Sequence, residues 1–294
     1  MIFFVFRSML MRYCFIIFYT SNPLVIYFAL FPLYYFWMFL PSMLFSILIL
    51  KKKWKSFLLF FSVPVFLFSI LIRPTTLFLT GLFFVVAFRS AYSRIERRKI
   101  IAISVVYAAS VWFVLKLSPG SPWHTMYIGI GAYANDLGIP DTFDQRGTDY
   151  FYKKTGIAID TNPVYGNWNE SKIRNIYLKF LKNIYYNIMK ERPFLLIRNA
   201  FLNILQVFSV GYIVGCPIWT WASTALGFFV LVFLIYTRQF IWIQAILASA
   251  SSFAWYYPPI PSYNFSAYLL LAIGGISGLE QLFQKKVTHF QEHP

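Results

Sequence analysis

From Tyr13 to Leu50 the chain carries no charged residue. Segments of about 17–25 mostly apolar residues can span a bilayer core of roughly 30 Å. The run is too long for one span, so it predicts two, with a break near Pro23 or at Pro32. A chain that opens this way must place much of its surface in lipid.

The composition points in the same direction. Of the 294 residues, 59% are hydrophobic and only 12% are charged, with a mean hydropathy of +0.61. Soluble domains carry about 25% charged residues, so a soluble globular enzyme, a disordered chain and a fibrous repeat are excluded. The net charge of +16 would suggest nucleic acid in a soluble protein. In an apolar chain it predicts contact with membrane lipids, cations in cytoplasmic loops, and no nucleic-acid partner.

Further apolar segments predict an all-α polytopic membrane protein with about eight transmembrane helices, in a range of roughly seven to nine. Beyond the first two, the expected spans cover residues 57–72, 75–88, 100–117, 218–236, 240–257 and 265–283. The chain then divides into an N-terminal transmembrane region (1–117, about five spans), an extracytoplasmic, mainly helical domain (118–217) and a C-terminal transmembrane region (218–294, about three spans).

Charge sets the expected orientation. Basic clusters at residues 51–55 and 89–99 belong inside by the positive-inside rule, which places residues 118–193, with seven of the ten acids, outside. Segment 194–215 either spans or lies in the interface or re-enters. Its polar residues favour an interfacial segment, which leaves both termini cytoplasmic. We expect a bacterial inner (plasma) membrane protein of the cell envelope.

The extracytoplasmic domain contains one strong helical pattern, over residues 171–192. Apolar residues such as Ile173, Tyr177 and Ile184 recur at helical spacing, and lysines and asparagines occupy the remaining positions. Pro193 stops the helix. This amphipathic helix either packs on its own domain or lies near anionic lipid headgroups.

The candidate chemical residues gather between positions 122 and 152, among several aromatic residues. They are His124, Asp136, Asp141, Asp144, Arg146 and Asp149. Carboxylates serve as general bases or hold a divalent cation, the one cofactor that this cluster leaves open. His124 has no second His or Cys nearby, so zinc is not expected, and an acid–base or phosphate-binding role remains. The alternative is that the acids cap turns and keep a surface loop soluble.

Three arginines are the candidates for binding a lipid-linked phosphate: Arg73, Arg146 and Arg198. Guanidinium groups bind phosphate through paired, charge-assisted hydrogen bonds. Arg73 lies between two short apolar segments, where an arginine is costly in lipid. It either has a function or extends its charged end to the membrane surface.

Three stretches suggest a family: Ile72-Arg73-Pro74-Thr75-Thr76-Leu77, the Trp123–Tyr152 loop after a span, and Tyr256-Tyr257-Pro258-Pro259-Ile260-Pro261 before a last helix. In this arrangement the chain resembles the polytopic glycosyltransferases of the GT-C superfamily over residues 57–283. The resemblance implies an extracytoplasmic reaction with a polyprenyl-phosphate-linked sugar.

One feature departs from that family. Its catalytic acid lies in the first extracytoplasmic loop, whereas no Asp or Glu precedes Glu96 here. The chain therefore lacks an N-terminal portion, is a degenerate relative, or is not a member, and no family catalytic residue is carried over. The candidate bases remain Asp136, Asp141, Asp144 and Asp149.

The leading hypothesis is a membrane glycosyltransferase of the hexosyltransferase type. It includes the cases in which this chain is truncated or inactive. One alternative is a polymerase or ligase of polysaccharide chains similar to those of O-antigen, which would use lipid-linked oligosaccharides. The other is a non-catalytic transporter or assembly subunit, in which a partner membrane subunit supplies the missing acid.

Overall fold

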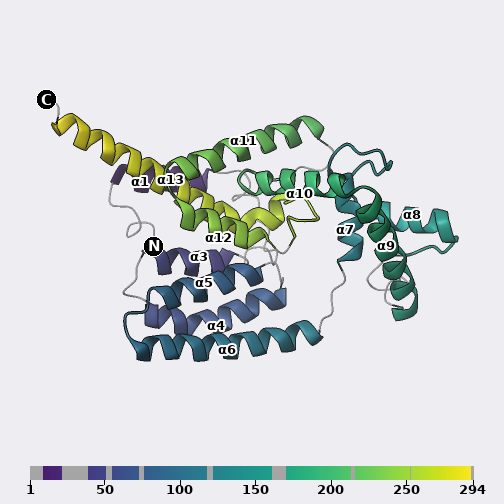
Figure 1. Cartoon of the computed structure of the whole chain (residues 1–294), viewed down its shortest axis with the longest axis horizontal. Helices are drawn as coiled ribbons and strands as arrows, with labels where there is room; N and C mark the ends of the chain where they lie inside the picture. Colours follow the sequence, from purple (N-terminus) through teal and green to yellow (C-terminus); the bar gives the residue numbers. More distant parts are fainter. Residues whose placement is uncertain are drawn as a thin grey trace.

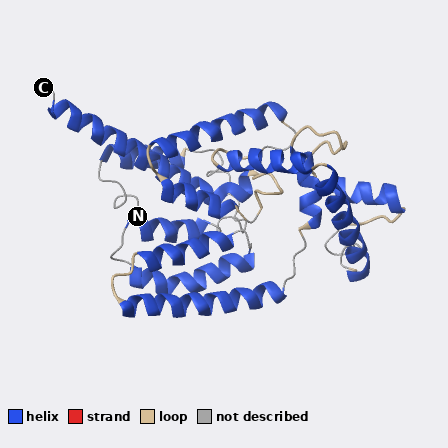
Figure 2. Ribbon diagram, viewed as in Figure 1, coloured by secondary structure: helices blue, strands red, loops and turns tan. Residues whose placement is uncertain are grey.

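The computed structural model describes residues 9–21, 39–50, 55–72, 76–117, 122–160, 170–212, 216–251 and 253–292. Within these ranges the regular structure is helical throughout, without a strand (Figure 2). The α-helices are α1 (Met9–Thr20), α3 (Phe39–Leu50), α4 (Lys55–Ile72), α5 (Leu77–Arg89), α6 (Arg94–Leu117), α7 (Trp123–Gly129), α8 (Gln145–Thr155), α9 (Ser171–Glu191), α10 (Pro193–Val207), α11 (Pro217–Tyr236), α12 (Phe240–Ala250) and α13 (Pro261–Glu292). A short 3-10 helix, η5 (Ile130–Ala132), follows α7. The all-α prediction is confirmed for this part of the chain.

Helices α3, α4, α5 and α6 pack side by side and form one half of an apolar bundle (Figure 1). Aromatic rings fill its centre: Phe66 meets Phe83 and Phe84 edge to face. Tyr107 of α6 packs on the same rings. Because each such ring buries about 150–250 Å², apolar packing is the main interaction that holds this half together.

A polar cap fixes the start of α6. The Glu96 N–H donates to Ser93 Oγ at 3.1 Å, and the Glu96 carboxylate accepts the Tyr92 N–H at 2.9 Å. This exchange resembles a capping box, which satisfies donors that lack an acceptor within the helix. It explains why the only acid before Asp136 lies in a run of arginine and lysine.

The C-terminal helices complete the bundle. Helix α13 packs against α12, α11, α3 and α1, and α12 packs against α5. The N-terminal and C-terminal halves are thereby joined along α3–α13 and α5–α12 (Figure 1).

Helices α7, α8 and α9 with η5 form a separate cluster at one end of the bundle, on the right of Figure 1; we call it the α7–α9 cluster. Phe151, Tyr177 and Leu181 form its fully buried core. The segment between α12 and α13 attaches it to the bundle: a Cβ on Gly129 would lie 2.1 Å from the carbonyl oxygen of Tyr256. The close backbone contact therefore requires glycine.

Most of the acids lie at one end of the bundle, whereas bases lie at both ends. The turn from α5 to α6, next to Arg94, Arg97 and Lys99, lies on the left of Figure 1, as does the turn at Arg238 between α11 and α12. We call this the basic end. The α7–α9 cluster, on which the carboxylates between residues 136 and 149 lie, is at the opposite end.

Two described helical segments are long and apolar enough to cross a membrane, Pro217–Tyr236 and Asn264–Gln284. Shorter apolar segments accompany them in α3, α4, α5, α10 and α12. On α11 many large apolar side chains are exposed, including Ile218 (84%) and Phe229 (67%). Apolar surface of this extent marks a protein or lipid contact. These features agree with a membrane protein, while the count of about eight spans stays a prediction.

Helix α10 carries amide side chains on its inner side, while the interfacial placement of segment 194–215 stays a prediction. Asn199, Asn203 and Gln206 are buried, whereas Phe194 and Ile197 are exposed. The three amides make hydrogen bonds inside the protein, while Arg198 on the same helix is exposed. Buried amides beside exposed apolar side chains are the arrangement expected of a helix whose outer surroundings are apolar.

Segment 194–212, which includes α10, begins and ends near the α7–α9 cluster. Leu195, near its start, packs with that cluster. Leu205, near its end, lies against Gly227 in the middle of α11. The chain then returns, and the Tyr212 N–H donates to the Pro259 carbonyl at 2.9 Å. Segment 194–212 therefore enters and leaves at the same end of the bundle.

Candidate functional site

The α7–α9 cluster and the adjoining start of α10 carry every predicted site residue that the structure describes. His124 lies on α7, Asp136 and Asp141 lie in the loop before α8, Asp144 directly precedes α8, Arg146 and Asp149 lie on α8, and Arg198 lies on α10. Arg73 lies outside the described residues.

His124, Asp144 and Tyr177 meet in one polar group, which we call the histidine group. The distance from His124 Nδ1 to the Tyr177 hydroxyl oxygen is 2.5 Å, and that from Nε2 to Asp144 Oδ1 is 3.3 Å. The three residues come from α7, the start of α8 and α9. Packing among these three helices therefore sets the geometry of the group.

Burial assigns the protons in the histidine group. Tyr177 is fully buried, and this burial raises the pKa of its phenol well above the ordinary value. The phenol therefore keeps its proton, and its O–H donates a hydrogen bond to His124 Nδ1, so that His124 Nε2 is the donor towards Asp144. The hydrogen bond from His124 lowers the pKa of Asp144, against the opposing effect of partial burial. Asp144 is thus ionised at neutral pH.

The three residues of the histidine group differ in solvent exposure, and this difference indicates a different role for each. The side chain of Asp144 is 82% exposed and that of His124 is 20% exposed. A substrate hydroxyl can therefore reach Asp144, which is able to act as a general base. Buried Tyr177 holds the imidazole, and the imidazole orients the carboxylate.

Gly147 leaves room for the histidine group. A Cβ on Gly147 would lie 2.4 Å from the Tyr177 hydroxyl and 2.9 Å from His124 Nδ1. Any side chain there would push the two residues apart. Neither Gly147 nor Tyr177 stood out in the sequence as a site residue. The one available signal was a tyrosine in the middle of a buried helix face, since a buried hydroxyl needs a partner.

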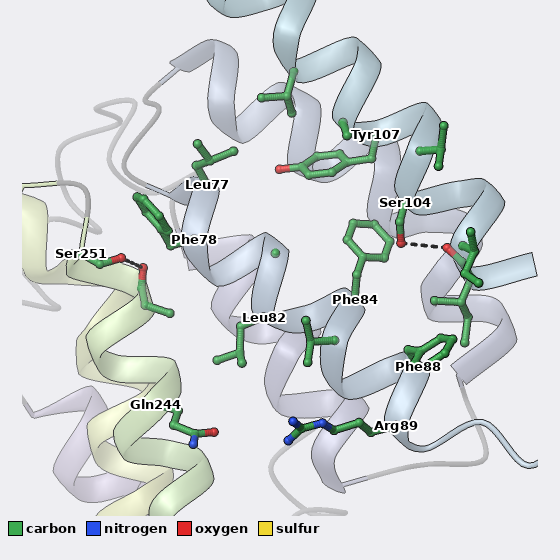
Figure 3. Close-up of a pocket in the computed structure, with 18 of the residues that line it drawn as sticks. Leu77, Phe78, Leu82, Phe84, Phe88, Arg89, Ser104, Tyr107, Gln244 and Ser251 are labelled. Carbon is green, nitrogen blue, oxygen red and sulfur yellow. Dashed lines mark hydrogen bonds between the residues drawn. The ribbon is translucent and has the colours of Figure 1, made fainter. Parts of the chain in front are cut away.

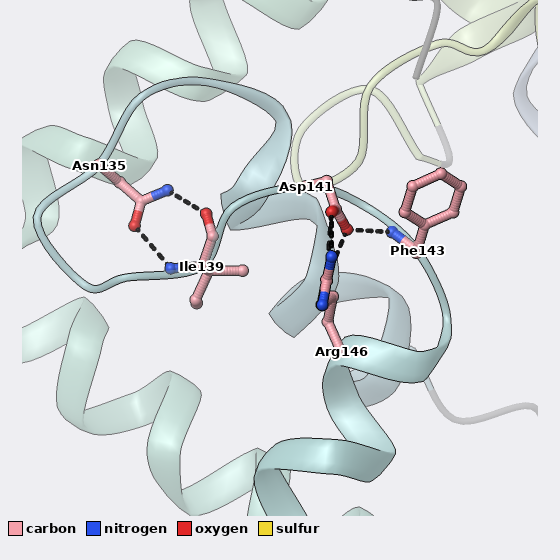
Figure 4. A network of polar contacts seen from close by, with 5 residues as sticks. All are labelled: Asn135, Ile139, Asp141, Phe143 and Arg146. Carbon is pink, nitrogen blue, oxygen red and sulfur yellow. Dashed lines mark hydrogen bonds and ion pairs between the residues drawn. The ribbon is translucent and has the colours of Figure 1, made fainter. Parts of the chain in front are cut away.

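Asp141 and Arg146 form a bidentate ion pair (Figure 4). Arg146 Nε donates to Asp141 Oδ1 at 2.9 Å, and Nη2 donates to Oδ2 at 2.6 Å. The Phe143 N–H adds a backbone hydrogen bond to the carboxylate, at 3.0 Å. Arg146, predicted to bind phosphate, is here the counterion of a carboxylate, and it fixes the loop to α8.

Asn135 shapes the same loop (Figure 4). Its Oδ1 accepts the backbone N–H groups of Leu137 and Ile139, and its Nδ2 donates to the Ile139 carbonyl at 2.8 Å. Such local side-chain bonds replace the helical pattern with a turn. The loop therefore presents Asp141 in a defined position.

A cavity of about 370 Å³ opens beside Asp141. Its walls are residues 131–134, Pro140, Asp141, Tyr212, Cys216, Pro217, Thr220 and Trp221. Two tyrosine rings, an indole and a carboxylate thus border one space. The volume falls in the range of roughly 300–1,000 Å³ that is typical of small-molecule sites, and this combination suits a sugar ring.

The remaining predicted residues are not brought into the histidine group. Asp136 pairs with Arg192 at 2.5 Å, and both side chains are about half exposed. Asp149 is exposed on α8. Arg198 donates to the Ala134 carbonyl at 2.8 Å and to Asn199 Oδ1 at 2.9 Å. Arg198 therefore links α10 to the rim of the cavity, since Ala134 is part of its wall.

The Asp141–Arg146 pair predicts a pH effect on stability. The hydrogen bond from Arg146 lowers the pKa of Asp141. A lowered carboxyl pKa contributes stability that is present above the unfolded-state value, about 3.9, and is lost as the pH falls through the folded-state value. Asp141→Asn should therefore lower the apparent Tm at pH 7 and make its decline in acid shallower. Thermal unfolding in detergent across the acid range measures this, and Asp149→Asn should keep the wild-type profile.

Within the ranges that the structure describes, no group of three or more His, Cys, Asp or Glu side chains is placed to hold a metal ion. Comparison of the chain with protein-family models, curated proteins and solved structures found no match. The candidate function therefore depends on the geometry of the site alone.

Proposed function

We propose that the chain is a multi-pass protein of the bacterial inner membrane, with about eight spans and both termini cytoplasmic. The division of charge supports this: the basic end belongs in the cytoplasm by the positive-inside rule, and the α7–α9 cluster lies at the opposite end. The path of segment 194–212, which returns to the end where it enters, supports the even count.

Given this membrane topology, we propose that the protein transfers a sugar from a polyprenyl-phosphate carrier to an extracytoplasmic acceptor. One observation carries the proposal. An exposed carboxylate held by a histidine, and a cavity with aromatic and carboxylate walls, both lie at the end of the apolar bundle opposite its basic end. A lipid-linked donor needs this combination, because its chain remains in the bilayer while its sugar reaches the surface.

The proposed step is a single inverting displacement. The acceptor oxygen forms a bond to the anomeric carbon while the bond from that carbon to the phosphate oxygen breaks. The hydroxyl proton passes to the Asp144 carboxylate, and polyprenyl phosphate leaves. His124 positions Asp144 through their hydrogen bond. Arg198, exposed at the rim of the cavity, and Arg73 are the proposed phosphate ligands.

A second candidate is a non-catalytic assembly subunit, and one observation favours it. Asp136 and Asp141 are both engaged by arginines, and both ring nitrogens of His124 are bonded within the protein. Residues held in this way also serve a purely structural role. In this version the α7–α9 cluster docks a partner membrane protein that carries the catalytic acid.

A transfer assay distinguishes the candidates. The purified chain is reconstituted in liposomes with a radiolabelled monosaccharide on polyprenyl phosphate and a panel of hydroxyl-bearing lipid and glycan acceptors. We expect labelled product from the monosaccharide donor. Product formed only from a lipid-linked oligosaccharide would instead indicate a polymerase or ligase. Absence of product with every donor, from protein with a cooperative thermal transition, would refute catalysis by this chain.

A further inference from the structure

A long groove lies between α5, α6 and α12, away from the histidine group (Figure 3). Its volume is about 1270 Å³, above the roughly 300–1,000 Å³ of ordinary small-molecule pockets. The walls are almost entirely apolar and include exposed side chains such as Phe78, Val105 and Trp112. The groove therefore suits a large apolar body.

The polar side chains of the groove fall into two kinds. Ser104 and Ser251 donate to carbonyl groups of their own helices, and Tyr107 bonds to Thr80. These groups are satisfied within the protein. Arg89 and Gln244 are different: in the described part of the chain no hydrogen bond or ion pair of either side chain is found.

Arg89 and Gln244 lie at the same end of the groove, and Leu77 and Ser251 lie at the other (Figure 3). The Arg89 end is the basic end of the bundle. Glu96, the acid nearest to Arg89 in the sequence, is used in the cap of α6. An occupant that complements this groove has an apolar body and a negatively charged head.

We propose that the groove binds an anionic phospholipid. Its acyl chains lie along α5, α6 and α12, and its phosphate accepts hydrogen bonds from Arg89 and Gln244. Arginine favours phosphate through charge-assisted, forked hydrogen bonds. The leaflet at a basic membrane end is rich in anionic lipid. The inference rests on the proposed membrane placement and not on sugar transfer.

Gly81 provides a way to close the groove without disturbing the fold. It lines the groove, and a Cβ built on it has no heavy atom within 4 Å. A leucine there extends into the space proposed for an acyl chain. Gly81→Leu therefore tests the apolar part of the site, and Arg89→Ala tests the charged part.

Native mass spectrometry of the full chain in mild detergent measures the binding of phosphatidylglycerol and phosphatidylcholine. We expect one retained phosphatidylglycerol, favoured over phosphatidylcholine by about tenfold or more, the scale of one charge-assisted contact. Arg89→Ala should weaken phosphatidylglycerol binding by about tenfold, and Gly81→Leu should weaken binding of both lipids. Arg98→Ala removes a charge at the same end but outside the groove, so it should leave binding unchanged.

Three results would overturn the proposal. If both lipids are retained equally and Arg89→Ala leaves their retention unchanged, the phosphate contact is excluded. An equal loss in Arg98→Ala would indicate general charge attraction only. A fall in the Tm of Gly81→Leu with unchanged lipid binding would indicate that the chain itself fills the groove. Failure of the sugar-transfer assay changes none of these outcomes, so the two proposals fail separately.

Discussion

Gly227→Ala should destabilise the protein by about 2 kcal/mol, although alanine is the better helix former. A Cβ on Gly227 would lie 1.9 Å from the carbonyl oxygen of Leu205, and a backbone oxygen cannot turn away as a side chain can. Overpacking costs up to about 3 kcal/mol, and the gain in helix propensity of about 1 kcal/mol offsets only part of it. Small residues of this kind let membrane helices approach closely. The apparent Tm in detergent should fall by roughly 4–8 °C.

Gly275→Ala is the matched control. Gly275 lies in α13, and a Cβ there has no neighbour within 4 Å. The same substitution should therefore raise the Tm slightly, by the helix-propensity gain of up to about 1 kcal/mol. Opposite signs at the two glycines identify the contact between α10 and α11 as the cause. Equal shifts at both positions would mean that α10 does not lie against α11 as described.

Asp144→Asn should lower the rate of sugar transfer by about 100-fold or more, because a positioned general base contributes roughly 10²–10⁴ to a rate. The amide keeps the size of the carboxylate and removes its capacity to accept a proton. The exposed position of Asp144 means that the Tm should change little. The measurement is the initial rate at saturating donor, read beside thermal unfolding of the same sample.

Two further variants separate catalysis from structure. Asp149→Asn removes an exposed carboxylate from the same helix and should keep the full rate. Tyr177→Phe removes the hydrogen bond to His124 Nδ1, so the imidazole loses its fixed tautomer. The rate should fall less than in Asp144→Asn, and its pH profile should shift. A full rate in Asp144→Asn would remove the base assignment and favour Asp136 or Asp141.

Periodicity and composition predicted the helical class correctly. The amphipathic stretch 171–192 reads as a helix in the sequence, and α9 covers Ser171–Glu191. Its buried residues, Tyr177, Leu181 and Tyr185 among them, recur at helical spacing. Such local patterns are readable because each depends on neighbours three or four residues away.

The pairing of charged residues was not readable in the same way. The sequence predicts that Arg146 binds phosphate, whereas the structure pairs it with Asp141. Tyr177 fits the apolar pattern of its helix, yet its hydroxyl faces His124. These contacts depend on how α7, α8 and α9 pack, over separations of up to 53 residues. For α10 the hydrophobic pattern predicts a polar and an apolar face, but not which of the two faces the protein interior. The polar face of a helix turns inward when the helix is surrounded by lipid and outward when it is surrounded by water. The direction therefore depends on the surroundings, which the sequence pattern does not reveal.

The buried amides of α10 have a consequence for assembly if the protein lies in a membrane as proposed. Buried amides such as Asn203 and Gln206 bond to Tyr133, Thr220 and Thr224, and in hydrocarbon each unsatisfied group costs several kcal/mol. Two of these partners lie on α11, which leaves the ribosome after α10. On the proposed membrane placement, we therefore expect segment 194–212 to complete its packing only after α11 has been synthesised.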